Sequence, residues 1–179
     1  MSKNNYQNTL LATCEFRNLT QQDIPVIVAS FTQIGWNKPA ELFQKYLKEQ
    51  ENNTRSVWVV FNHEDFVGYA TLKYHSDYQS FNTQNIPEIN DLNVLPEFRN
   101  LGIGSKLLDL AEQEAQKLGS RVGLGVGLHA DYGPAQKLYV KRGYILDGNG
   151  ITYKNKPLKF GETVCLDDDL VLWFTKKLV

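Results

Sequence analysis

The apolar residues of this chain show two kinds of pattern in different segments. One kind predicts helices and the other predicts strands. A recurrence every three or four residues, typical of an amphipathic helix, is clearest from residue 103 to residue 118 and stops at Gly119. Runs rich in β-branched and aromatic residues indicate strands. The pattern predicts strands over residues 12–18, 56–61, 66–74, 88–94, 121–128, 144–146 and 170–177, and helices over 20–33, 39–51, 103–118 and 134–142.

The order of these elements indicates an α/β fold with a mixed central sheet flanked by helices. One strand and two helices come first, antiparallel strands follow, and strands then alternate with helices. We expect a single domain over residues 12–179, after a polar and flexible lead-in of residues 1–11. A polar connecting segment is expected over residues 76–87, and Thr20-x-x-Asp23 has the spacing of a capping box.

The amino-acid composition limits the classes of partner and ligand that we expect this protein to bind. The 19 basic and 20 acidic residues nearly cancel, which argues against a nucleic-acid partner. No apolar run is long enough to span a bilayer, and the first residues lack the apolar core of a signal peptide, so we expect a cytoplasmic protein. The cysteines and histidines lack the spacing of metal ligands, so no metal is expected. These features are compatible with a monomer or a homodimer.

The segment between the strand over 88–94 and the helix over 103–118 carries the most informative chemistry. It reads Arg-Asn-Leu-Gly-Ile-Gly over residues 99–104. N–H groups at a helix start, together with the helix dipole, bind phosphate oxygens, and glycines let the backbone approach the anion. A Walker loop needs G-x-x-x-x-G-K followed by Ser or Thr, which is absent, and a Rossmann loop needs a third glycine where Leu107 stands. A tight turn without a ligand is the remaining alternative.

This segment resembles the phosphate loop of the GNAT family of N-acetyltransferases. The family signature is Gln or Arg, then Gly three residues later, then Gly or Ala two residues after that, and Arg99, Gly102 and Gly104 match it. The resemblance extends back to Leu92 and forward to a second block. In that block the matching residues are Ala135, Leu138, Tyr139, Gly143 and Tyr144.

The resemblance implies an acetyl-CoA-dependent N-acetyltransferase. The pyrophosphate of CoA would lie on backbone N–H groups from Leu101 to Ser105, and its pantetheine arm between two splayed parallel strands, 88–94 and 121–128. The cofactor-binding residues implied are Val94, Arg99, Asn100, Leu101, Gly102, Ile103, Gly104, Ser105, Tyr132 and Ala135. At Tyr132 the chain departs from the family, which usually has Asn at that position.

The resemblance also suggests catalytic roles. Tyr139 would protonate the departing CoA thiolate, and the Val94 N–H would stabilise the oxyanion. Glu88 and Asp91 are both candidates for the general base, although regular alternation places them on opposite faces unless a bulge intervenes. The alternatives are a packed tyrosine, solvated carboxylates and a base supplied by water.

The acceptor is expected to be a primary amine of a small molecule or a peptide. The turn over 35–38 and the segment over 74–87 would flank it, with Asp77, Glu88 and Asp91 suited to a cation. Alternating glycines at residues 123, 125 and 127 indicate a close approach, either of a ligand or of a packed helix. A non-catalytic CoA sensor and another phosphate-binding module remain alternative functions.

Overall fold

The computed structural model describes residues 11–179, and the contacts among these residues divide them between two units. The first unit holds residues 11–72 and 91–114, and the second holds residues 73–90 and 115–179. Strand β4 (Glu88–Val94) and helix α5 (Ile103–Leu118) each belong partly to both units. The lead-in predicted over residues 1–11 lies outside the described residues except for Leu11, and one domain over 12–179 stays a prediction.

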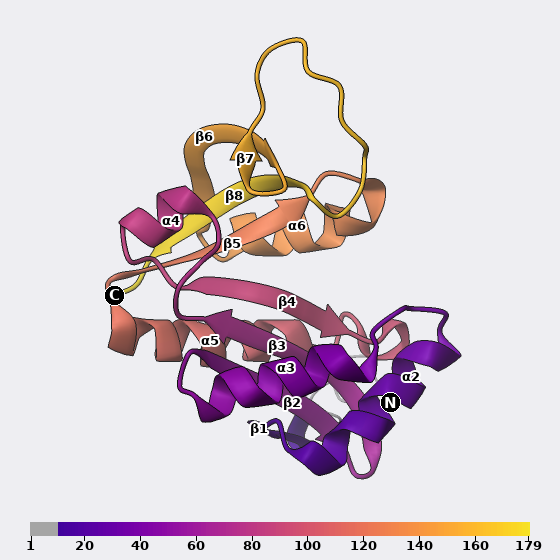
Figure 1. Cartoon of the computed structure of the whole chain (residues 1–179). Helices are drawn as coiled ribbons and strands as arrows, with labels where there is room; N and C mark the ends of the chain where they lie inside the picture. Colours follow the sequence, from indigo (N-terminus) through magenta and orange to yellow (C-terminus); the bar gives the residue numbers. More distant parts are fainter. Residues whose placement is uncertain (1–10) are drawn as a thin grey trace. The chain divides into compact units, whose positions relative to one another are not determined.

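Strands β1 to β3 and the second half of β4 form the sheet of the first unit (Figure 1). Strand β1 (Cys14–Asn18) pairs antiparallel with β2 (Arg55–Asn62), which places Cys14 opposite Asn62. Strand β3 (Asp65–Lys73) follows after a tight turn, and the strand order is β1-β2-β3-β4. The first strand begins two residues later than predicted because residues 11–13 are helical.

Two helices follow β1, as the sequence predicts. A 3-10 turn (Gln21–Asp23) leads into α2 (Ile24–Gln33), and α3 spans Ala40–Glu51 with Pro39 as its N-cap. The capping box is confirmed, because the Thr20 N–H donates to Asp23 Oδ2 at 2.8 Å. Arg17 donates to both oxygens of the same carboxylate at 2.7 Å, which anchors the end of β1 to the start of α2.

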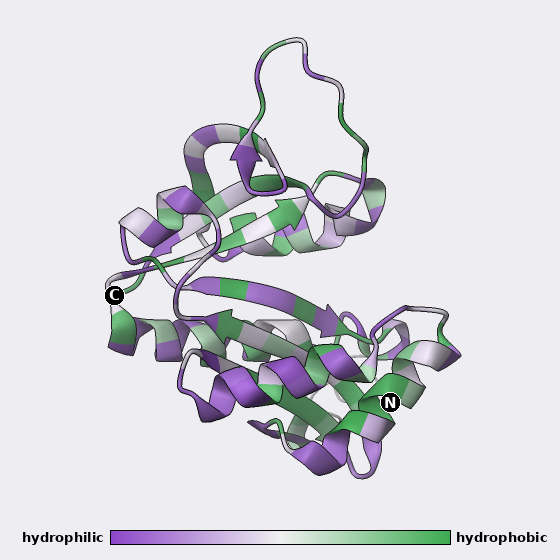
Figure 2. Ribbon diagram, in the orientation of Figure 1, coloured by the Kyte–Doolittle hydropathy of each residue, from purple (hydrophilic) through white to green (hydrophobic). Residues whose placement is uncertain are grey.

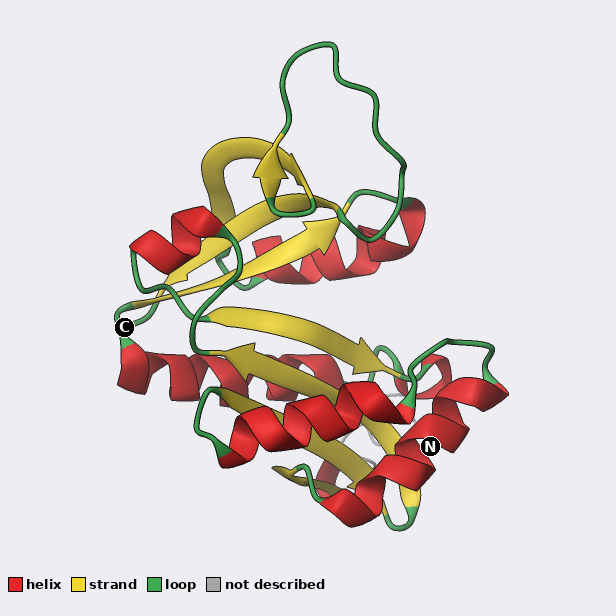
Figure 3. Ribbon diagram, in the orientation of Figure 1, coloured by secondary structure: helices red, strands yellow, loops and turns green. Residues whose placement is uncertain are grey.

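The core of the first unit is aromatic. Phe31 of α2, Phe43 of α3 and Tyr69 of β3 are fully buried, and the Phe43 and Tyr69 rings meet edge to face at 5.3 Å. Strands β2 and β3 are buried along almost their whole length, which requires cover on both faces. Figure 3 shows helices on both sides of these strands, and Figure 2 shows the strands as hydrophobic beside the mostly hydrophilic α3.

The sheet of the second unit is mixed, as predicted. Strand β4 pairs parallel with β5 (Arg121–Gly127), with Glu88 opposite Gly123 and Ile89 opposite Leu124. Strand β5 then pairs antiparallel along its whole length with β8 (Leu170–Lys177). The order continues through β6 (Ile145–Tyr153) to β7 (Lys156–Pro157).

Two predictions for the second unit are wrong: one missed a short helix, and the other ended a strand too early. The polar segment over 76–87 contains a short helix, α4 (Gln79–Thr83), because Phe81 is fully buried and anchors it. Strand β6 runs on to Tyr153 rather than ending at Leu146. The register with β8 shifts between Leu146 and Ile151, and the glycines and polar residues in that interval hide the strand from a pattern search. Helix α6 spans Gly133–Lys141, one residue from its prediction at each end.

No helix within residues 11–179 combines the length and the apolar character needed to cross a membrane.

Candidate active site

The phosphate loop of the first unit has the backbone geometry of an anion site. A short 3-10 turn (Pro96–Phe98) follows β4, and α5 starts at Ile103. Asn100 and Gly102 both have left-handed backbones, with φ of +61° and +87°. The first bond of α5 runs from Lys106 N–H to the Gly102 carbonyl at 3.0 Å. This bond places the predicted residues Asn100 to Ser105 at the N-terminal end of α5, the end at which a helix directs its N–H groups outward.

Arg99 takes a position that the sequence does not predict. Its Nε donates to the Val94 carbonyl at 3.1 Å, and its guanidinium lies over the Trp36 ring, 5.4 Å from the centroid. Arg99 therefore connects the end of β4 to the turn between α2 and α3. Trp36 also stacks on Phe31 at 5.9 Å, so it contacts both the aromatic core and Arg99.

Gly68 is a site residue that the sequence analysis missed. A Cβ on Gly68 would lie 2.5 Å from the Asn93 carbonyl oxygen and 3.0 Å from the Val94 Cα. Only glycine permits this approach of β3 to the last residues of β4, which include the predicted oxyanion donor Val94. A glycine inside an otherwise apolar strand was the available signal.

Asp91 lies at an irregular point of β4. Its φ of +57° is unusual for a residue other than glycine and breaks the regular alternation of the strand. Its carboxylate accepts four hydrogen bonds, two on each oxygen. On Oδ1 the donors are Lys38 Nζ at 2.6 Å and Asn93 Nδ2 at 2.7 Å. On Oδ2 they are the hydroxyl groups of Tyr46, at 2.9 Å, and of Tyr69.

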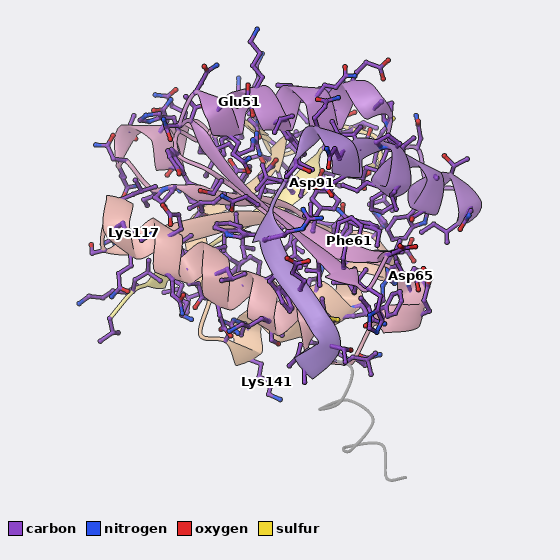
Figure 4. The ribbon with its side chains drawn as sticks, turned by 90° about the horizontal axis from the view of Figure 1, so that it is seen from below. Glu51, Phe61, Asp65, Asp91, Lys117 and Lys141 are labelled. Carbon is purple, nitrogen blue, oxygen red and sulfur yellow. The ribbon has the colours of Figure 1, made fainter. Side chains whose placement is uncertain are left out.

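These four bonds bear on the proposed role of Asp91 as a base. A carboxylate has about four lone-pair positions, and all are used here, so a proton taken from a substrate would have to displace a donor. Burial and the Asp91 charge raise the pKa of Tyr46 and Tyr69 well above the usual tyrosine range, so both remain donors. Figure 4 labels Asp91 near the middle of the view and Glu51, at the end of α3, toward its upper edge; the Asp91 side chain has 16% exposure.

Glu88, the other candidate base, belongs to the second unit. Its side chain is buried, with 6% exposure, and accepts hydrogen bonds from Ser76 Oγ and from Asn90 Nδ2 at 3.1 Å. Burial raises the pKa of Glu88 above its ordinary value, and the bonds from Ser76 and Asn90 only partly oppose this shift. A raised pKa brings a carboxylate closer to the range in which it can accept a proton at neutral pH.

Tyr139 lies on α6, with 7% exposure and its ring edge-on to Tyr144 at 5.9 Å. Burial raises the pKa of Tyr139 to about 12. Within the described part of the chain, its hydroxyl has no hydrogen-bond partner. A buried phenol without a protein acceptor is suited to donate to a ligand atom. The predicted cofactor residue Ala135 lies in the first turn of the same helix.

Tyr132 stands at the position where the family usually has Asn, and its side chain contacts other residues of the second unit. Its hydroxyl donates to Asp168 Oδ1 at 3.1 Å, and its ring meets His129 edge-on at 4.7 Å. A Cβ on Gly127 would lie 2.4 Å from the Tyr132 ring. The contact of Tyr132 with a cofactor arm therefore stays a prediction.

The three alternating glycines of β5 accommodate aromatic side chains of this chain. A Cβ on Gly123 would lie 2.1 Å from the Phe81 ring, and one on Gly125 would lie 3.0 Å from the Trp173 ring. Tyr132 fills the same role at Gly127. Of the two alternatives, helix packing therefore holds at Gly123, where Phe81 comes from α4. Trp173 in turn stacks on Tyr78 at 4.2 Å and donates to Thr152 at 2.7 Å.

Two further polar side chains near these residues form ion pairs or close contacts. Asp77 forms an ion pair with Lys73, and His129 lies 3.2 Å from Asp168. Within residues 11–179 no three side chains of His, Cys, Asp or Glu are grouped so that they could hold a metal ion.

The family model of the Acetyltransferase (GNAT) family matches residues 15–144. The chain belongs to this family, and it is therefore an acetyltransferase. The matched region contains the phosphate loop, Glu88, Asp91 and Tyr139. A search of curated proteins found none that matches this chain.

Solved structures show the same fold. A ribosomal-protein-alanine N-acetyltransferase from Brucella melitensis has 22% identity and a TM-score of 0.64, over 92% of this chain and 99% of that one. The structure of yncA from Salmonella typhimurium, described with its cofactor acetyl-CoA, has 16% identity and a TM-score of 0.65, over 93% and 95%. A chimera of the spermidine N-acetyltransferase SpeG from Vibrio cholerae and hSSAT has 15% identity and a TM-score of 0.64, over 93% and 96%. At these identities the likeness shows the fold alone.

Proposed function

We propose that this protein transfers the acetyl group of acetyl-CoA directly to a primary amine of a small molecule or peptide. The observation that carries the proposal is the start of α5, where Asn100 and Gly102 hold the family's phosphate loop in left-handed conformations. Acetyl-CoA, when bound, supplies an activated thioester. The N–H groups from Leu101 to Ser105 would hold its pyrophosphate, since the loop geometry fits an anion and no carboxylate lies within the loop itself.

Three groups of the chain would assist the transfer. Glu88, directly or through a water molecule, would accept the proton that the attacking nitrogen loses, because its pKa is raised by burial. The Val94 N–H would donate to the oxygen on which negative charge develops as the carbon–nitrogen bond forms. Tyr139 would donate its proton to the sulfur as the carbon–sulfur bond breaks, so that CoA leaves as a thiol.

Direct attack needs no covalent intermediate on the protein. Holding the two reactants side by side replaces an encounter in solution and supplies much of the rate. The proposal also accounts for Gly68 and Arg99, which fix the last residues of β4 from two sides. If Val94 were displaced, its backbone N–H would no longer point at the oxygen on which negative charge develops.

A ligand panel tests the proposal. Acetyl-CoA and CoA are expected to raise the melting temperature, and ATP and NAD to leave it unchanged. A ligand at 100 times its dissociation constant adds about 2.7 kcal/mol of stability, which a thermal-shift assay resolves. An amine library with acetyl-CoA should then release free thiol. Binding without turnover on any amine would favour the CoA sensor, and stabilisation by ATP or NAD alone would favour another phosphate-binding module.

The raised pKa of Glu88 gives a prediction for pH dependence. As pH falls through that pKa, Glu88 becomes protonated and can no longer accept a proton, so kcat/KM should fall with a midpoint above about 4.3, the ordinary value for Glu. Glu88→Gln should lose this limb and about 10²-fold in activity. Glu41→Gln, an exposed carboxylate on α3, is the control and should retain both. An unchanged acid limb in Glu88→Gln would exclude Glu88 as the titrating base.

A further inference from the structure

An ammonium group of the chain itself occupies a site formed by a carboxylate and an aromatic ring. Lys38 Nζ lies 2.6 Å from Asp91 Oδ1 and 5.9 Å from the centroid of the Tyr69 ring. A carboxylate beside a ring face is a common way to bind an ammonium group. Lys38 belongs to the turn between α2 and α3, which also carries Trp36, and Asp91 belongs to β4.

The site is built without help from Lys38. Tyr46, Tyr69 and Asn93 each donate to the Asp91 carboxylate, and together they fix its orientation. Tyr69 is fully buried and Tyr46 has 5% exposure, so both hydroxyls are held by the aromatic core. These contacts leave one lone-pair position on Oδ1, which the Lys38 ammonium fills.

Lys38 is held more loosely than the site it fills. Its side chain has 23% exposure, so its ammonium can reach water, whereas the Asp91 side chain has 16% exposure. Fixing the flexible lysine stem costs conformational entropy, and that cost returns when the side chain is released. Asp91 would then be left charged, partly buried and short of one cation. An external ammonium of similar size can make the same contacts, and it displaces Lys38 when its concentration, or further contacts of its own, outweigh the effective concentration of the tethered lysine.

We propose that Asp91, Asn93 and Tyr69 form a binding site for a primary alkylammonium group, and that Lys38 occupies this site until a ligand displaces it. Resting on the proposed function, the inference extends to the acceptor, which is an aliphatic diamine. An amine paired with Asp91 is protonated and cannot attack a thioester. The group that replaces Lys38 is therefore the non-reacting amine of the acceptor, and the other amine, as the neutral base, is acetylated.

A binding measurement tests the site separately from catalysis. Lys38→Ala leaves a vacancy of the size of the lysine side chain, and n-butylamine is the matching probe. Calorimetry should show n-butylamine binding to Lys38→Ala about tenfold or more tightly than to the wild type, since a hydrogen bond to a charged group gives a gain of this order. Lys45→Ala, which removes an exposed lysine of α3, is the matched control and should bind as the wild type does.

Further variants keep the result decisive. Adding Asp91→Asn to Lys38→Ala should abolish the gain, and circular dichroism checks the fold of each protein. If Lys38→Ala does not fold, Lys38→Ser creates the same vacancy and takes its place. Equal affinity of the vacated variant and the wild type, or a gain that survives Asp91→Asn, would overturn the proposal.

Kinetics test the extension to the acceptor. Lys38→Ala should lower the KM for 1,4-diaminobutane about tenfold with little change in kcat, because only ground-state competition is removed. n-Butylamine should inhibit this variant competitively against the diamine. An unchanged KM would overturn the diamine assignment. If no amine releases thiol, the proposed function fails, while the calorimetric result still decides the ammonium site.

Discussion

Replacing Tyr139 by Phe is expected to lower turnover by about 10²- to 10⁴-fold, the usual contribution of a general acid. The substitution removes only the hydroxyl, which has no hydrogen-bond partner in residues 11–179, and it keeps the ring and its contact with Tyr144. The KM for acetyl-CoA should change little, because the hydroxyl matters most when negative charge develops on sulfur.

The pKa of Tyr139 makes this prediction sharper. Burial raises it to about 12, so the phenol stays protonated through the neutral and mildly alkaline range. An alkaline limb below about pH 11 would then belong to another group, because Tyr139 has not yet lost its proton there. The rate should therefore fall in Tyr139→Phe by a similar factor at every pH from 7 to 10, as measured by thiol release under conditions in which chemistry limits turnover.

Tyr144→Phe is the matched control for Tyr139→Phe. Tyr144 is buried beside Tyr139 on the same unit, and the family block accepts Phe or Tyr at this position. This variant should keep most of the activity. If Tyr139→Phe turns over at the wild-type rate, Tyr139 serves only in packing, and water or another donor protonates the thiolate.

Replacing Gly102 by Glu is expected to weaken acetyl-CoA binding by at least about 10²-fold. The side chain would place a negative charge at the start of α5, where the pyrophosphate is proposed to bind, and like charges about 4 Å apart repel by about 4 kcal/mol at an intermediate dielectric. The left-handed backbone of Gly102 adds strain for any residue with a Cβ. Calorimetry with acetyl-CoA measures the loss.

Two controls separate charge from strain. Gly102→Asn introduces a residue that tolerates the left-handed conformation and adds no charge. This variant should therefore lose far less affinity for acetyl-CoA than Gly102→Glu. Gly161→Glu makes the same substitution at a glycine with φ of +86° in an exposed loop, and it should bind as the wild type does. Gly104→Val adds bulk without charge and should also weaken binding. Wild-type affinity in a folded Gly102→Glu protein would contradict the assignment of the loop.

The periodic elements were predictable because their signals are local. The strand over Glu88–Val94, the helix over Ile103–Leu118 and the strand over Leu170–Lys177 have the predicted bounds. The helix ends at Gly119, the first strand is followed by Pro96, and the last strand is preceded by the charged turn over residues 167–169. Helix α4 and the long β6 were missed because one buried phenylalanine and an interrupted register leave no period to detect.

The candidate site was predictable only in part. The two glycines at 102 and 104 lie within one short segment. They indicate an anion-binding loop because a helix begins at the same place. Gly68 and Arg99 act on Val94 from other parts of the chain, and a sequence does not show which strands approach each other so closely. The glycines of β5 were correctly taken as points of close approach, but their neighbours are side chains of this chain: Phe81 at Gly123, Val171 and Trp173 at Gly125, and Tyr132 at Gly127.

By itself, the sequence determined the main helices and strands, the phosphate loop and the family, because each depends on residues that are neighbours along the chain. The tertiary structure alone decided the environments that set reactivity. Asp91 became a saturated carboxylate because Lys38, Tyr46 and Tyr69 converge on it from three other elements. Glu88 and Tyr139 acquired raised pKa values because folding removed them from water. Desolvation and convergence arise only when distant segments pack together, and no local pattern encodes them.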